Sequence, residues 1–69
     1  MELKSGQFVR VREDHPEKRC AGKDGLISEV DANTVGLTFG YDRHSNWQNV
    51  ICHGIELWMQ YELDLNSVY

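Results

Sequence analysis

Five side chains have the chemistry of metal ligands or of catalytic nucleophiles and bases, namely Cys20, Cys52, His15, His44 and His53. The ligands of a structural zinc site usually come in pairs about two to four residues apart. Cys52 and His53 are instead adjacent, and neighbouring residues of a strand point to opposite faces. No nucleophile motif surrounds either cysteine, and no glycine-rich phosphate loop is present. We therefore expect no catalytic residue, metal or cofactor, and we expect buried, inert thiols.

The cysteine count and the N-terminal sequence indicate the compartment. Two cysteines are too few for the disulfide-dense design of small secreted domains, although a disulfide between Cys20 and Cys52 is an alternative. Residues 1–6 contain no apolar run of the length that a signal peptide needs, and the chain has no run of about 20 apolar residues that could span a membrane. We expect a cytoplasmic protein with reduced thiols.

The charges are distributed unevenly along the chain. The net charge is -4, yet residues 1–23 carry six Lys and Arg against four Asp and Glu, whereas residues 24–69 carry one against seven. A basic strand face with an aromatic ring, continued by cations in the next loop, is a surface on which RNA bases stack. The alternative is a solvated face whose cations pair with neighbouring acids. The candidate nucleic-acid-binding residues are Phe8, Arg10, Arg12, Lys18, Arg19 and Lys23.

Aromatic residues form the second candidate surface. The chain holds two Trp and three Tyr, and aromatic side chains dominate the centres of protein interfaces. In so small a protein at least one tryptophan should fill the core, so this prediction depends on the other. The candidate protein-binding residues are Tyr41, Trp47, Trp58 and Tyr61.

These side chains must be positioned by short strands, which alternating apolar residues predict. A strand at 7–13 would bury Val9 and Val11, and a strand at 34–39 would bury Val35, Leu37 and Phe39. Further strands are expected at 26–30, 47–52 and 55–57, with a polar loop at 14–25 and turns at 31–33 and 40–46.

The C-terminal segment is ambiguous. Leu57, Tyr61 and Leu65 are spaced four residues apart, so the chain from Glu56 onward also fits a helical face. We expect one short helical turn there and no long helix.

Five short strands without a long helix favour a single all-β domain over residues 1–69. A small five-stranded barrel is expected, because closure removes exposed strand edges. One core in a chain of this size rarely contributes more than about 3–5 kcal/mol. Self-association or a partner would therefore add stability.

The first part of the chain resembles a known motif. Gly6-Gln7-Phe8-Val9-Arg10-Val11, followed after a loop by Ala21-Gly22-Lys23-Asp24-Gly25-Leu26-Ile27 and Val30, is similar to the KOW motif of SH3-like barrels over about residues 6–31. This resemblance implies an SH3-like barrel and contact with RNA or RNA–protein machines. Ile55-Glu56-Leu57-Trp58 is also similar to the final strand of type II dihydrofolate reductases, which would imply a tetramer with a folate site.

Two hypotheses about function follow. The first is a non-enzymatic SH3-like module that binds a protein partner or a second copy of itself, which the acidic balance and the surplus aromatic residues favour. The alternative is a KOW-type module that binds RNA. An enzyme is expected only if an oligomer builds a site that one chain lacks.

Overall fold

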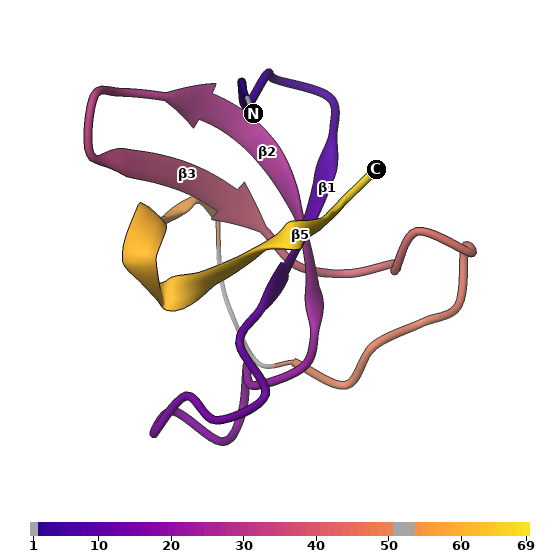
Figure 1. The fold of residues 1–69 in the computed structure, drawn as a ribbon. Coiled ribbons are helices and arrows are strands. Elements are labelled where there is room, and N and C mark those ends of the chain that lie inside the picture. Colours follow the sequence, from indigo (N-terminus) through magenta and orange to yellow (C-terminus); the bar gives the residue numbers. More distant parts are fainter. Residues whose placement is uncertain (1, 51–53) are drawn as a thin grey trace.

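One antiparallel sheet and a single 3₁₀ turn make up the computed structural model, which describes residues 2–50 and 54–69. In chain order the elements are β1 (Phe8–Val11), β2 (Asp24–Val30), β3 (Thr34–Thr38), β4 (Glu56–Met59), η1 (Gln60–Glu62) and β5 (Leu63–Val68). The strands lie in the order β4-β3-β2-β1-β5 (Figure 1). The described residues contain no helix that is long and apolar enough to cross a membrane. The predicted all-β class is confirmed.

The apolar alternation of the sequence determines which strand face is buried. Val9 and Val11 in β1 and Leu37 in β3 are fully buried, and Val35 is nearly so. Phe39 is only partly buried and packs against the edge of this cluster. The predicted faces of these two strands are therefore correct. The core consists of Val9, Val11, Cys20, Ile27, Val35, Leu37, Trp58 and Leu63.

Gly25 allows β2 and β3 to pack closely at the centre of the sheet. It lies opposite Val9 in the β1–β2 pairing, on the buried face. A Cβ atom at this position would lie 2.8 Å from Cδ1 of Leu37, which is closer than two carbon atoms can approach without displacement. The Leu37 side chain thus occupies the space that a side chain at position 25 would need.

One predicted strand in the second half of the chain is wrong, and one strand there was not predicted. Residues 47–50 form no strand, because Trp47 makes only an isolated bridge to Tyr41; the rest of the expected strand, residues 51–52, lies outside the described residues. The short helical turn expected after β4 is confirmed as η1. The chain then continues as β5, a strand that was not predicted and that pairs with β1. The helical spacing of Leu57, Tyr61 and Leu65 is coincidental, since all three side chains are exposed.

The sheet is strongly curved because its two edges are joined by a very short connection. β4 and β5 are the edge strands, and only η1 separates them in the sequence. A flat sheet of five strands would place its edges about 19 Å apart, whereas a 3₁₀ turn rises only about 2 Å per residue. The edges must therefore approach each other at η1, and Figure 1 shows β2 and β3 bending accordingly. Among the described residues no hydrogen-bonded ladder joins β4 to β5, so the sheet is not closed.

Candidate functional site

The loop between β1 and β2 is ordered by tight turns of its own backbone. The amide of Cys20 donates to the carbonyl of Glu17 at 3.1 Å, and the amide of Gly22 donates to the carbonyl of Val11 at 3.0 Å, which closes the loop at its base. Gly22 has a φ of 75°, a left-handed conformation that glycine adopts without steric cost. The Cys20 side chain is 1% exposed and fixes the loop to the core.

His15 connects this loop to η1. Its Nε2 lies 2.6 Å from Oε2 of Glu62, and its Nδ1 accepts a hydrogen bond of 2.9 Å from the amide of Glu17. Because Nδ1 is an acceptor, the ring proton is on Nε2, which donates to the carboxylate. This hydrogen bond is the main reason why the pKa of Glu62 lies below its ordinary value. The other Glu62 oxygen accepts from the amide of Met59 at 2.9 Å, so one side chain holds both the loop and the start of η1.

Three adjoining hollows lie between residues 12–20 of this loop and residues 56–66, and together we call them the loop–turn groove. The first, about 770 Å³, shares Arg12, Asp14 and Tyr61 with the second, about 330 Å³. The second shares His15 and Glu62 with the third, about 250 Å³. The shared lining residues place the three hollows next to one another, between two segments that are distant in the sequence.

The loop–turn groove is predominantly acidic. Its lining holds two guanidinium groups, those of Arg12 and Arg19, and six carboxylates. A hydrogen bond from Arg12 lowers the pKa of Asp14, and one from Arg19 lowers the pKa of Glu17, so these groups stay ionised at neutral pH. The carboxylates are those of Glu13, Asp14, Glu17, Glu56, Glu62 and Asp64.

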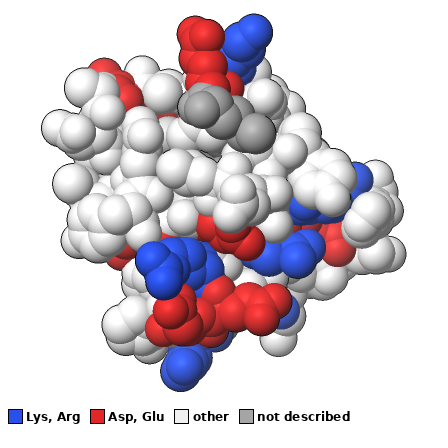
Figure 2. Space-filling view, viewed as in Figure 1, with Lys and Arg blue, Asp and Glu red and all other residues white. Residues whose placement is uncertain are grey.

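The charged groups at this end of the molecule alternate in sign. Figure 2 shows blue and red side chains interleaved at the lower end of the visible face, where Figure 1 places the loop between β1 and β2. The Nη2 atom of Arg12 lies 3.0 Å from Oδ2 of Asp14, and Nε of Arg19 lies 3.1 Å from Oε1 of Glu17. The neighbouring carboxylates therefore largely neutralise these two arginines, and the remaining charge of the groove is negative.

The four aromatic candidates occupy three different environments. Tyr61 lies on η1 in the loop–turn groove and is 73% exposed. Tyr41 and Trp47 are 61% and 68% exposed and form an edge-to-face pair with ring centroids 5.4 Å apart; Figure 1 places their loop on the opposite side of the molecule from η1. Trp58 is only 7% exposed, because it lies opposite Val35 on the buried face of β4. Trp58 is thus the core tryptophan, and its assignment to an exposed contact surface is not supported.

The six candidate nucleic-acid-binding residues do not form a free basic surface. Three of them make ion pairs with carboxylates, including Arg10 with Asp24 at 3.3 Å. Phe8 is half-buried in β1, and its backbone pairs with that of Tyr69. Lys18 is exposed in the loop, whereas Lys23 is half-buried beside β2. The solvated, acid-paired alternative agrees better with these contacts than a platform for bases does.

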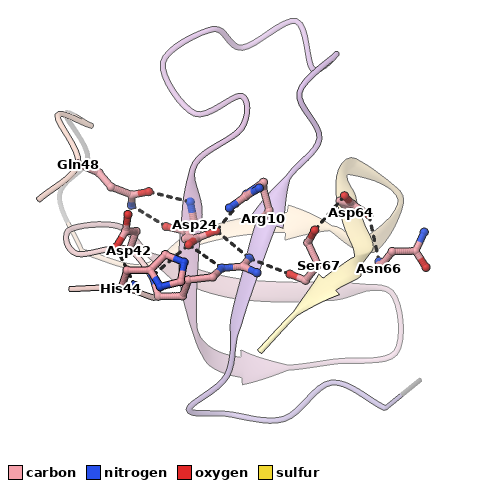
Figure 3. A network of polar contacts seen from close by, with 9 residues as sticks. Arg10, Asp24, Asp42, His44, Gln48, Asp64, Asn66 and Ser67 are labelled. Atoms are coloured by element: carbon pink, nitrogen blue, oxygen red, sulfur yellow. Dashed lines mark hydrogen bonds and ion pairs between the residues drawn. The ribbon is translucent and has the colours of Figure 1, made fainter. Parts of the chain in front are cut away.

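A buried polar network, which the sequence interpretation missed, lies on the opposite face of the sheet from the core. Asp24 is 2% exposed and accepts hydrogen bonds from the Nε and Nη2 atoms of Arg43, both at 2.8 Å, and from its amide at 3.0 Å. The side-chain amide of Gln48 bonds both backbone groups of Asp24 at 2.8 Å. Figure 3 shows Gln48 and Arg10 reaching Asp24 from opposite sides, Gln48 from the segment between β3 and β4 and Arg10 from β1.

The network also stabilises the irregular end of β5. The β1–β5 register shifts between Val9 and Arg10, because Val9 pairs with Val68 whereas Arg10 pairs with Asp64. Nη2 of Arg43 donates to the carbonyl of Ser67 at 3.0 Å within this interruption. Arg43 is the one Lys or Arg among residues 24–69. A single cation among seven carboxylates was the sequence signal that could have indicated a buried ion pair.

Among the described residues, the Cys20 thiol and the His15 imidazole line the same hollow. Burial raises the pKa of Cys20, which makes its thiolate scarce and the group unreactive. His15 and His44 lie on different loops, and residues 2–50 and 54–69 contain no group of three His, Cys, Asp or Glu side chains that could hold a metal ion. Cys52 and His53, and with Cys52 the alternative disulfide, lie outside the described residues.

Comparison with known proteins identifies no relative: no protein-family model, no curated protein and no solved structure matches this chain. The candidate site therefore consists of what the geometry itself provides, a predominantly acidic groove with an exposed tyrosine, beside a loop that a single His–Glu hydrogen bond joins to η1.

Proposed function

We propose that the chain is a non-enzymatic SH3-like barrel that binds an extended, basic segment of a partner protein in the loop–turn groove. Support for the barrel comes from the short η1 connection between the two edge strands, which brings them toward closure. Small barrels of this kind bind extended peptides in grooves lined by aromatic side chains.

The observation that carries the proposed function is the combination of an exposed aromatic ring and surplus negative charge in one groove. Tyr61 presents nearly three quarters of its surface, and a rigid ring gives large contact area at low entropic cost. Asp14 and Glu62 lie in the same hollow as Tyr61, and a lysine or arginine side chain complements their charge. A partner segment that combines cations with an extended backbone fits both features.

The same charges disfavour a polyanion. The phosphates of RNA would approach Asp14, Glu17 and Asp24, the carboxylates that already pair with the candidate cations. Neutralising phosphates requires cations that are available for contact. In the folded protein, residues 1–23 therefore offer fewer available cations to a polyanion than their composition indicates.

The test uses a blocked peptide of alternating lysine and proline, the Lys-Pro peptide, which is basic and extended. A titration followed by ¹H–¹⁵N NMR should shift amides of residues 12–17 and 60–66. Tyr61→Ala should weaken binding at least about fivefold, as expected for an interface aromatic residue. Tyr41→Ala removes an equally exposed tyrosine outside the groove and should bind as the unmodified chain does.

Three results would overturn this assignment. They are equal loss of affinity in the two tyrosine variants, equal binding of a glutamate–proline peptide, and shifts along β1 on addition of single-stranded RNA in place of shifts in the groove. Sedimentation in the same buffer shows whether a second copy of the chain occupies the groove instead.

A further inference from the structure

The third hollow of the loop–turn groove is lined by two residues of the core, Cys20 and Trp58. It lies between the loop and β4, with His15, Cys20 and Trp58 among its lining residues. The His15 ring meets the Trp58 indole edge-to-face at 5.3 Å between centroids, and Phe39 meets the indole at 5.9 Å. The indole is thus held between two rings at the inner wall of the hollow.

Most polar groups around this hollow already have partners. Glu17 accepts from Arg19, and Glu62 accepts from His15 and from the amide of Met59. The remaining nitrogen of the His15 ring, Nδ1, accepts from the amide of Glu17. None of these groups requires a ligand to complete its hydrogen bonding.

The exception is Nε1 of Trp58, which is buried and has no acceptor among the described residues. The indole N–H can only donate, and a buried donor without an acceptor destabilises the folded chain. The missing group is therefore an acceptor. Carboxylates of Glu17, Glu56 and Glu62 line the same hollow, so an anionic acceptor such as a carboxylate or phosphate would be repelled.

We infer that Nε1 of Trp58 donates a hydrogen bond to an amide carbonyl oxygen of the segment that docks in the loop–turn groove. This inference rests on the proposed function and adds the group that the third hollow of the groove recognises. An amide carbonyl is a strong acceptor without charge, and every residue of an extended peptide carries one. Since the indole nitrogen is covered in the free protein, docking requires the side chains that cover it to move aside.

The two tryptophans provide an internal control, because each indole N–H gives its own ¹H–¹⁵N signal. On addition of the Lys-Pro peptide, the Trp58 indole proton should move downfield and exchange more slowly with water. The Trp47 indole, which is 68% exposed on a distant loop, should do neither. Trp47→Phe and Trp58→Phe assign the two signals. Trp58→Phe should also bind the peptide about three- to tenfold more weakly, the value of one hydrogen bond.

The possible results test the carbonyl contact and the proposed function separately. If groove amides shift while the Trp58 indole signal stays unchanged, the carbonyl contact is refuted and the proposed function stands. If neither shifts, both are refuted. Should Trp58→Phe fail to fold, the indole shift in the unmodified chain decides the question alone.

Discussion

Substitution of Asp24 by Asn should unfold most of the protein, although the two side chains have nearly the same shape. The Arg43 side chain is 4% exposed and that of Asp24 is 3% exposed, with Nη2 and Oδ1 2.8 Å apart. Removing one charge of such a pair leaves the other buried without compensation, at a cost of about 3–5 kcal/mol. A single core of this size contributes about the same amount in total. The loss therefore equals most of the free energy of unfolding.

Urea unfolding followed by circular dichroism measures this effect, with Asp14→Asn as the matched control. Asp14 is also paired with an arginine, but its side chain is 71% exposed, so water replaces the lost contact and the urea midpoint should not move. Replacing both partners, as Asp24→Leu with Arg43→Met, should give a chain more stable than Asp24→Asn, because the fully buried Arg43 charge is then removed as well. Arg10, the other partner of Asp24, keeps 34% of its side chain exposed, so water can solvate its charge. The reasoning is refuted if Asp24→Asn stays within about 1 kcal/mol of the unmodified chain.

Acid titration of the same variants gives an independent check. Burial raises the pKa of Asp24, but the hydrogen bonds and charge of Arg43, with the charge of Arg10, outweigh burial and hold that pKa below its ordinary value. A carboxylate with a lowered pKa in the folded state stabilises the protein above its unfolded pKa of about 3.9. That stabilisation is lost as the pH falls from there through the folded-state pKa. Any folded Asp24→Asn protein should lose less stability over this range.

Two further substitutions test the packing of β2 and the chemistry of the loop thiol. Gly25→Ala should lower the free energy of unfolding by about 1–3 kcal/mol, because the added methyl group overpacks against Leu37. Gly40→Ala is the control and should leave the urea midpoint unchanged, because its Cβ would meet no atom nearer than 3.9 Å. Equal effects of the two substitutions would contradict the proposed packing. In a Cys52→Ser background, Cys20 should react with iodoacetamide only as fast as the protein unfolds, since burial covers the thiol and raises its pKa; a rate equal to that of free cysteine in the native protein would contradict this assignment.

Sequence patterns predicted the parts of the fold that depend on neighbouring residues. The alternation in β1 and β3 identified the buried side chains, because period-two spacing by itself places residues on one face of a strand. β5 could not be identified in this way, since its ladder with β1 is formed by residues more than fifty positions apart. Local spacing alone predicted the short helical turn η1 but not the strand that follows it.

The candidate site was predictable only in part for the same reason. The sequence indicated that one tryptophan would be core, and the strand pairing selects Trp58 by placing it opposite Val35. Tyr61 was predicted to be a contact residue and is exposed, but the groove around it was not predicted. That groove requires His15 and Glu62, which are 47 residues apart, to meet across the loop.

The two polar clusters described above differ in a way that supports the proposed binding site in the loop–turn groove. Around Asp24 the polar groups form their hydrogen bonds with one another. The carboxylate accepts from two arginines, and Arg43 also donates to the carbonyl of Ser67, where the β5 ladder is interrupted. An apolar pair could match that stability but could not supply a donor to this carbonyl, so the network serves to fix the position of one loop against the end of β5. In the loop–turn groove, by contrast, carboxylates outnumber cations and the indole nitrogen of Trp58 has no described acceptor. Only the second cluster gains from an added cation and an added carbonyl group, which a basic peptide supplies together.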